Sequence, residues 1–439
     1  MSLSALPPHI QALLARIRAG ERNIRFSDQQ YGAFDADAAR GLNQANYADL
    51  TMPPRVSDIL LHRSSPTVSW QQIRQLWLGQ LKDAVAGPAL ESWYQKVGRE
   101  LMLASGQAVD LVRLIHRVFA EQNTDIVLSG LSGRDSSVLR RNQAASLAFL
   151  LEESASQETR IQRWRRHWRS IQVGNIVRKT LRQRAAGKAS RQQDMTDSLI
   201  ELLPELGIGR AVDSVVMALT AVNGPPGAAA ACLLYECQQQ SDWFEKVCEE
   251  LQQITVHQIC ADPLRQAPLS RRFIKEALRL WNVPMLVRQV RTDLQWQGEQ
   301  IQKDSVLMFS PFFVHRNPEY WPQPDEFNPE RWLADSPYAS QCPHTYVPFG
   351  WAPKSCVGAM LGSTQLLLLL HLFATRFQWK LLEPDRLDIT MTALPQPVAF
   401  DVELMVRTSA SAQLTRPDIL SQGPQCPFSE TKLEEGEQS

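Results

Sequence analysis

The sequence predicts a mainly α-helical protein with small β-sheets. Apolar residues recur every three or four positions in successive stretches between residues 69 and 155, as expected of amphipathic helices. A longer apolar stretch at residues 212–235 indicates a buried helix. Strand patterns are short and lie mainly at residues 294–306 and 378–406.

Composition excludes several classes of function. The chain has 439 residues, of which 44% are hydrophobic, and length alone does not decide between one large domain and several smaller ones. The 46 Lys and Arg are balanced by 46 Asp and Glu, so no overall positive charge indicates a nucleic-acid partner. The 7 cysteines form neither CxxC pairs nor zinc-ligand spacings, which favours a reducing compartment.

The two ends of the chain differ from the rest. Residues 1–18 contain only short apolar runs broken by Pro7, Pro8 and Arg16, so we expect a cytoplasmic protein without a signal peptide or transmembrane anchor. Residues 408–439 are rich in Ser, Gln and Glu and contain three prolines. Such a segment buries too little apolar surface to fold, so we predict a disordered tail.

The first predicted elements are a short strand and two helices. Residues 23–26 suit a strand, and residues 34–43 suit a helix with an acidic first turn. Ser69 is predicted to cap the next helix, which carries an apolar stripe. On that helix Trp70 and Arg74 are one turn apart, so their side chains can converge on one target. As isolated residues they more often belong to an amphipathic surface.

Residues 160–191 form a strongly basic segment. It carries eleven Lys or Arg and no acidic residue, interleaved with aliphatic side chains and with Trp164 and Trp168. The pattern predicts a pair of basic amphipathic helices. Four interpretations remain open, namely a solvated helix face, contact with a membrane surface, contact with an acidic carrier protein and contact with an anionic substrate.

The apolar stretch at residues 212–235 is long enough to suggest a membrane span, but Asn-Gly-Pro-Pro-Gly at residues 223–227 interrupts its middle. Pro225 and Pro226 have no amide N–H to donate, so we expect the helix to kink or open there. Asn223 is the only polar side chain within this break.

A later helix, over residues 270–281, places Glu276 and Arg279 on one face. In isolation this is a common surface ion pair. Residues 294–306 follow with the alternation of a hairpin around Gly298. His315 has no partner histidine nearby, so we expect a structural group rather than a metal ligand.

One loop, at residues 347–362, presents a single cysteine before an apolar helix. A lone cysteine is most often a small buried hydrophobe, but a Gly- and Pro-punctuated loop of this kind can also present one thiolate to a metal. Phe349 lies seven residues before Cys356, Lys354 lies two before it and Gly358 two after it. This spacing resembles the heme-binding loop of cytochrome P450s, whose cysteine is the axial thiolate ligand of the heme iron.

The resemblance extends over roughly residues 25–407, and its segments follow the order of the family. It implies a single catalytic domain over residues 1–407 with the cytochrome P450 fold, mainly helical with small β-sheets, that binds heme b. Cys356 is then the metal ligand. The matching residues elsewhere are Trp70 and Arg74, the pair Glu276 and Arg279, Arg288, and Arg331, which completes a structural triad with that pair.

The resemblance also implies which residues bind the cofactor. Phe349, Lys354, Cys356 and Gly358 belong to the heme-binding loop, and the heme propionates are held by Lys354 together with Trp70, Arg74 and Arg288. Two positions depart from the family pattern, because Ala352 stands where Gly is usual and Lys354 where Arg is usual. Lys keeps the charge but lacks the bidentate fork, so we expect a weaker propionate contact.

The interrupted apolar helix departs further from the family. Its counterpart crosses over the heme and usually carries an acid and an alcohol that relay protons during oxygen activation. Here Val222 or Gly224 takes the acid position and Asn223 or Pro225 the alcohol position, so neither group is present. We therefore take Asn223, Gly224 and Pro225 as the candidate catalytic segment.

The function that the resemblance implies is a monooxygenase of secondary metabolism. It would oxidise a hydrophobic small molecule with dioxygen and with electrons from a separate ferredoxin or flavodoxin-type protein. The missing acid and alcohol leave a second interpretation open, a heme-thiolate isomerase, dehydratase or peroxygenase that needs no redox partner. A third is a heme protein without catalytic activity that binds a ligand or a partner.

Overall fold

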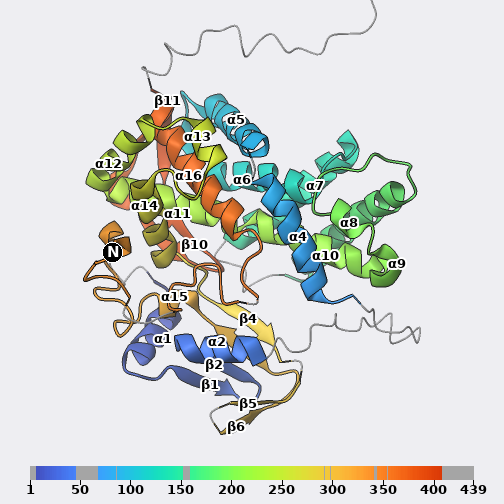
Figure 1. Ribbon diagram of the computed structural model, residues 1–439, viewed down its shortest axis with the longest axis horizontal. Coiled ribbons are helices and arrows are strands. Elements are labelled where there is room, and N and C mark those ends of the chain that lie inside the picture. Colours follow the sequence, from blue (N-terminus) through green and yellow to red (C-terminus); the bar gives the residue numbers. More distant parts are fainter. Residues whose placement is uncertain are drawn as a thin grey trace, which may run out of the picture.

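The computed structural model describes residues 6–45, 68–85, 87–151, 159–290, 292–296, 298–340, 344–352 and 354–407. Helices dominate this part of the chain, and short strands form small sheets beside them (Figure 1). The predicted fold class is therefore confirmed. The predicted tail at residues 408–439 lies outside the described residues, and the single domain remains a prediction.

The helices build most of the molecule. In chain order they are α1 (Pro8–Arg18), α2 (Ala36–Ala45), α4 (Trp70–Ala84), α5 (Gly87–Ala104), α6 (Leu111–Val127), α7 (Gly133–Leu151), α8 (Arg160–Ala185), α9 (Leu203–Leu206), α10 (Ile208–Asn223), α11 (Pro225–Gln239), α12 (Ser241–Gln252), α13 (Val256–Ala261), α14 (Pro268–Leu280), α15 (Pro311–Val314) and α16 (Ala359–Thr375). Short 3₁₀ helices lie at Asp197–Leu199, Pro329–Trp332 and Pro384–Arg386.

The strands form small sheets. One has the order β1 (Asn23–Ser27), β2 (Gln30–Ala33), β7 (Val306–Phe309) and β4 (Leu286–Gln289), with β2 and β7 parallel. Another joins β3 (Ala108–Asp110), β11 (Asp401–Val406) and β8 (Phe377–Leu381), and two-stranded pairs join β9 (Asp388–Met391) with β10 (Pro395–Val398) and β5 (Leu294–Trp296) with β6 (Glu299–Ile301). In Figure 1 the sheet containing β2 lies with α1 and α2 below the helical body.

The main core lies around α16, the helix that follows the cysteine loop. Its run from Leu366 to Leu370 is buried, with no residue more than 4% exposed. Burying each of these side chains contributes about 1.5–3 kcal/mol. Helix α16 packs against α5, α12 and α14, while α6 packs along both α10 and α11. The start of α16, where the cysteine loop ends, is therefore held by a rigid bundle.

Helices α10 and α11 form the interrupted apolar helix. Residues Ile208–Gln239 together are long and apolar enough to cross a membrane, although 56% of the most apolar window is buried inside the protein. Helix α10 ends at Asn223 and α11 starts at Pro225, with Gly224 between them at φ −124° and ψ −63°. The predicted opening of the helix is thus observed. Pro225 stands at the first position of α11, where a missing N–H costs nothing.

Two predictions need correction. The basic segment was predicted as a helix pair, but it forms one helix, α8, of 26 residues, which begins with a capping box of Thr159 and Gln162. This capping box defines the start of the helix. The segment contains no proline, and the helix continues through Gly174 and ends shortly before Gly187. The second correction concerns residues 294–306, of which only β5 and β6 pair around Gly298, while Val306 belongs to β7 in another sheet.

Candidate functional site

The loop before α16 is fixed by its own backbone. Gly350 has φ +75°, a conformation that favours glycine, and its amide donates to the Val347 carbonyl at 2.9 Å. The Cys356 amide donates to the Phe349 carbonyl at 2.8 Å, which closes the loop over seven residues. The second of these hydrogen bonds joins Phe349 and Cys356, two of the residues whose spacing resembles a heme-binding loop.

Side chains from distant segments hold the same loop from outside. The Val347 amide donates to Nε2 of His315 at 2.9 Å, and Asn282 donates from Nδ2 to the Pro348 carbonyl at 3.0 Å. Asn43 of α2 donates to the carbonyl of Trp351 at 3.2 Å. The sequence analysis did not single out Asn43 or Asn282, because such contacts between side chains and backbone leave no local pattern.

Cys356 is an exposed residue at the end of this loop. Desolvation by the surrounding protein raises its pKa, while a hydrogen bond from the Gly358 amide and the nearby Arg74 guanidinium lower that pKa. A Cβ atom at position 358 would lie 3.8 Å from the sulfur, so the glycine backbone passes directly beside it. Desolvation has the larger effect, so the net pKa of Cys356 is raised, while the amide donor and the cation are the two groups beside the sulfur that favour its thiolate form.

Helix α4 brings Arg74 to the cysteine loop. Ser69 caps this helix as predicted, in a capping box with Gln72. Arg74 donates from one terminal nitrogen to Oγ of Ser355 at 3.2 Å, next to the cysteine. Trp70 lies one turn earlier and packs edge-on against Trp77, with ring centroids 5.5 Å apart. Arg74 therefore lies at the cysteine loop, whereas Trp70, at the start of the same helix, packs against the core.

Strand β4 lies against the same loop and carries Arg288. A Cβ atom at Gly350 would lie 3.4 Å from Cδ1 of Leu286, so β4 touches the loop at this point. Leu286 and Arg288 are two positions apart in the strand and therefore lie on the same face. Burial lowers the pKa of the Arg288 guanidinium, whose hydrogen bond goes to the neighbouring Val287 carbonyl at 3.0 Å. Among the described residues no carboxylate lies within ion-pair distance of Arg288, so this half-buried cation suits an anionic group from outside the chain. Lys354 is half-buried within the loop.

The buried side-chain amide of Asn223 lies at the break between α10 and α11. Asn223 is 4% exposed and donates from Nδ2 to the Gln143 carbonyl of α7 at 3.1 Å. Its Oδ1 atom has no hydrogen-bond partner among the described residues. The only polar side chain of the break is therefore joined to a neighbouring helix through one of its two polar atoms.

A buried histidine, which the sequence analysis missed, lies against the same break. His116 of α6 is fully buried, and neither ring nitrogen has a hydrogen-bond partner within the described part of the chain. A Cβ atom at Gly227 would lie 2.6 Å from Nδ1 of His116, so only glycine fits there. Burial lowers the pKa of His116 to about 4, which keeps the ring neutral near pH 7. An isolated histidine on a helix gives no sequence signal for this packing.

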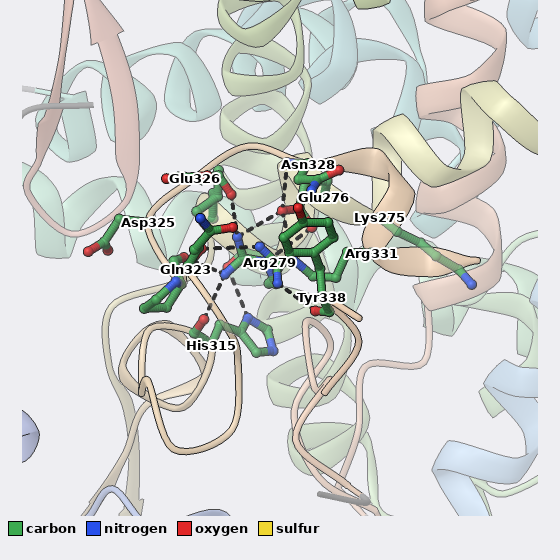
Figure 2. A network of polar contacts seen from close by, with 12 residues as sticks. Lys275, Glu276, Arg279, His315, Gln323, Asp325, Glu326, Asn328, Arg331 and Tyr338 are labelled. Carbon is green, nitrogen blue, oxygen red and sulfur yellow. Dashed lines mark hydrogen bonds and ion pairs between the residues drawn. The ribbon is translucent and has the colours of Figure 1, made fainter. Parts of the chain in front are cut away.

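A buried polar network supports the loop from the side of α14. Glu276 accepts hydrogen bonds from Nη2 and Nε of Arg279 at 2.8 and 3.0 Å and from Nε of Arg331 at 3.1 Å (Figure 2). Arg279 also donates to the His315 carbonyl at 2.8 Å. The three charged groups are fully buried, so the predicted triad is present and its role is structural rather than catalytic.

His315 connects this network to the cysteine loop. Its Nδ1 is 3.0 Å from the Arg279 carbonyl, and its Nε2 accepts the Val347 amide. The ring is therefore neutral with its proton on Nδ1, and burial lowers its pKa to about 3. The expectation that His315 is a structural group rather than a metal ligand agrees with this geometry.

Known proteins with similar sequences and structures include several with assigned chemistry. A Mycobacterium tuberculosis protein named putative cytochrome P450 139 is 29% identical over 37% of this chain and 39% of its own length. The beta-amyrin 16-beta-monooxygenase of Platycodon grandiflorus is 26% identical over 51% of this chain and 49% of its own length. The chain thus spans between two fifths and half of the length of these relatives.

The fold is similar over nearly the whole chain to a solved heme domain. The crystal structure of the cytochrome P450DA heme domain superposes with a TM-score of 0.67, at 17% identity, over 91% of this chain and 93% of that one. The sequence model of the cytochrome P450 family matches residues 34–402, which include the cysteine loop, the buried triad and the interrupted helix. The chain therefore belongs to the cytochrome P450 family.

Proposed function

We propose that this chain is a cytoplasmic heme-thiolate monooxygenase that oxidises a hydrophobic small molecule. The observation that carries this proposal is Cys356, an exposed residue at the end of a loop fixed on both sides, whose thiol lies beside the Gly358 amide and Arg74. The name of the Platycodon grandiflorus relative, a beta-amyrin monooxygenase, supports a hydrophobic substrate of secondary metabolism.

The family implies a heme, and the residues around the cysteine fit one. The donor set offers an accessible sulfur for the iron, and Arg74, Lys354 and Arg288 offer cations to the propionates. We propose heme b, with Trp70 and Phe349 among the residues that contact it. When bound, heme supplies the oxidising chemistry, and a thiolate ligand favours cleavage of the O–O bond.

Each residue of the loop then has a physical role. The Gly358 amide donates a hydrogen bond to the sulfur, which stabilises its negative charge. Arg74, tied to Ser355 at 3.2 Å, adds positive charge near the same atom. Asn223, Gly224 and Pro225 line the oxygen side of the site in this proposal. Nδ2 of Asn223 donates to Gln143, and Oδ1 has no hydrogen-bond partner within the described part of the chain, so in this proposal Oδ1 accepts a hydrogen bond from an ordered water.

A basic cleft supports electron delivery by a separate acidic protein of the ferredoxin or flavodoxin type. The cleft has a volume of about 380 Å³, and its lining includes four basic residues and Trp332; the basic residues are Arg265, Arg271, Arg272 and Lys275. One of its lining residues, Lys275, accepts a hydrogen bond at its backbone carbonyl from the hydroxyl of Tyr346 at 3.2 Å, and Tyr346 directly precedes the cysteine loop. Positive charge at this position would speed association with an acidic donor and make it sensitive to salt.

The first experiment is the absorption spectrum of the purified protein, reduced with dithionite and exposed to carbon monoxide. A strongly red-shifted Soret band is expected for the wild type and should be lost in Cys356→Ser. Cys248→Ser, which removes a thiol far along the chain from the loop, is the matched control and should keep the band. Absence of heme in the wild type would contradict the proposal, and so would an unchanged band in Cys356→Ser.

A second candidate function is favoured by the altered helix break. Neither an acid nor an alcohol is present at residues 222–225, and one polar atom of Asn223 is bonded to α7. An isomerase, dehydratase or peroxygenase would not need two protons delivered to dioxygen. Turnover with dioxygen, NADPH and surrogate redox partners, measured beside turnover with organic peroxides alone, separates the two. Product only with peroxide would replace the monooxygenase proposal, and tight ligand binding without any product would indicate a non-catalytic heme protein.

A further inference from the structure

The basic cleft beside α14 gathers cations that the buried triad does not use. Three of its four basic residues, Arg271, Arg272 and Lys275, belong to α14. At 100° per residue they lie within an arc of about 100°, so they share one face of the helix. Figure 2 shows Lys275 extending away from the network that surrounds Glu276. The first turns of α14 therefore present a basic face to the cleft.

The chain itself neutralises these cations only weakly. Nε of Arg265, the fourth basic residue, lies 3.9 Å from the Asp262 carboxylate, and both side chains are exposed to solvent. Among the described residues no carboxylate forms an ion pair with the three cations of α14, and Arg271 donates to a backbone carbonyl at 3.2 Å instead. Burial and the charge of Arg271 both lower the pKa of Lys275. An anion in the cleft would offset this repulsion between like charges.

The backbone at the start of α14 is already occupied by an anion of this chain. The Glu250 carboxylate accepts hydrogen bonds from the amides of Leu269 and Ser270 at 2.9 and 2.7 Å. This contact uses the positive end of the helix. An external anion in the cleft would therefore meet the basic side chains rather than free backbone amides.

The rest of the cleft lining is apolar and includes one indole. Leu264 and Leu333 line it with 58% and 47% of their surface exposed, and Trp332 lies beside them. The indole is held in place, because its Nε1 donates to Oε2 of Glu276 at 3.1 Å and the Tyr346 ring packs against it with centroids 4.4 Å apart. Nζ of Lys275 lies 5.4 Å from the centroid of the same indole. The cleft thus places positive charge directly beside a fixed aromatic surface.

We propose that this cleft binds a nucleoside diphosphate, with the diphosphate on the cations and the base on Trp332 and its apolar neighbours. Guanidinium groups bind phosphate oxygens through paired hydrogen bonds, and four cations suit a multiply charged diphosphate better than a single carboxylate. The flat face of a base can stack on an aromatic side chain. The volume of about 380 Å³ falls within the usual range for small-molecule sites.

A nucleotide in this cleft would compete with the acidic electron donor proposed above, since both would use the same cations. Nucleotide binding requires neither reduced heme nor a donor protein, so it can be measured separately from electron delivery. Its failure would leave the proposed monooxygenase activity untouched.

The test is isothermal titration calorimetry of the full chain with its heme against adenosine diphosphate, inorganic diphosphate and adenosine. We expect adenosine diphosphate to bind, inorganic diphosphate to bind more weakly and adenosine to give no measurable heat, with binding of the nucleotide weakened by salt. Arg271→Ala with Arg272→Ala should weaken nucleotide binding about tenfold or more. Arg140→Ala with Arg141→Ala, at an adjacent pair of exposed arginines on α7, is the matched control and should bind as the wild type does.

Three results would overturn the proposal. One is failure of the wild type to bind adenosine diphosphate, in which case donor binding that depends on Arg271 and Arg272 would assign the cleft to the donor protein alone. Another is equal binding by the two double variants. The third is equal affinity for the nucleotide and for inorganic diphosphate, which would indicate a general anion site.

A single variant separates loss of ligand contact from loss of fold. The Arg272 side chain makes no hydrogen bond or ion pair within the described part of the chain, so Arg272→Ala should leave the fold intact. We expect it to weaken nucleotide binding about threefold or more. Circular dichroism checks the fold of each variant, and unchanged affinity in a folded Arg272→Ala protein would count against the assignment of the diphosphate to this face of α14.

Discussion

Arg331 donates from Nε to Oε1 of Glu276 at 3.1 Å, and both side chains are fully buried. The remaining nitrogens of Arg331 donate to the carbonyls of Pro322, Gln323 and Tyr338 at 2.6–3.1 Å. One guanidinium therefore ties together α14 and the segment that leads to the cysteine loop (Figure 2).

Removal of Arg331 should destabilise the protein strongly. Arg331→Ala leaves Glu276 with one charged partner instead of two and orphans three carbonyls, so we expect a loss of about 3–5 kcal/mol in the free energy of unfolding. Arg386→Ala removes an exposed ion pair with Glu383 and should cost at most about 1 kcal/mol. Denaturant unfolding of both variants measures the difference, and similar small losses would mean that the buried triad contributes little.

Gly227→Ala should also destabilise, because the added methyl group would meet His116. The new Cβ atom would lie 2.6 Å from Nδ1 and 2.8 Å from the backbone Cα of that histidine. The backbone contact cannot be relieved by a side-chain rotation, so we expect a cost of about 1–3 kcal/mol. Gly79→Ala in α4 meets no atom within 4 Å and should stabilise its helix by about 0.5–1 kcal/mol. Thermal unfolding of the two variants compares them directly.

The buried His116 should make stability depend on pH. Its pKa is about 4 in the folded protein and about 6.5 in the unfolded chain, so the unfolded chain binds more protons between these values. The free energy of unfolding should therefore fall as pH drops from about 6.5 to about 4, with up to about 3 kcal/mol due to this residue. His116→Leu should show a shallower decline than the wild type in denaturant unfolding at several pH values. The exposed His167→Leu serves as control, and equal slopes for wild type and His116→Leu would contradict the assignment.

Glu236 of α11 should act in the opposite direction. Its side chain accepts a hydrogen bond from Nε1 of Trp281 at 2.7 Å, and burial raises its pKa to about 7 from a usual 4.5. The folded state thus holds a proton that the unfolded state releases, and wild-type stability is lost as pH rises from about 4.5 to about 7.

Glu236→Gln removes this titration while keeping an oxygen for Trp281. We expect the variant to match the wild type near pH 4.5 and to be more stable by up to about 3 kcal/mol at pH 8. Glu245→Gln, at an exposed position of α12, is the matched control without such a gain. If the difference in free energy of unfolding between Glu236→Gln and the wild type is the same at pH 4.5 and at pH 8, Glu236 is ionised in the folded protein and the assignment is wrong.

Local sequence signals predicted the elements and several of the contacts. Ser69 starts α4 because its side chain can cap the helix, and the double proline at 225 and 226 separates α10 from α11 because it removes backbone donors. The spacing of Glu276 and Arg279 predicted a pair on one face of α14. Each of these signals acts within one or two helical turns, which is the range over which residue type alone constrains the backbone.

The remaining features depend on contacts between distant segments. Asn282 reaches the Pro348 carbonyl across 66 residues, and Gln143 offers its carbonyl to Asn223 across 80 residues. His116 is confined by Gly227, on another helix. No periodicity or motif in the sequence predicts such pairs of distant residues. The helix pair expected in the basic segment was wrong for a related reason: α8 continues through Gly174, and the sequence alone does not reveal whether a single glycine ends a helix.

The parallel pairing of β2 with β7 has a consequence for synthesis of the chain. Gln30 pairs with Val306, so 276 residues (306 minus 30) must follow β2 before its partner is complete. At about 5–20 residues per second, a ribosome needs about 14–55 s for this interval. Until then β2 has only β1 beside it, and the edge that β7 will cover can pair with another emerging chain. The speed of translation, rather than equilibrium stability, sets how long that edge stays exposed.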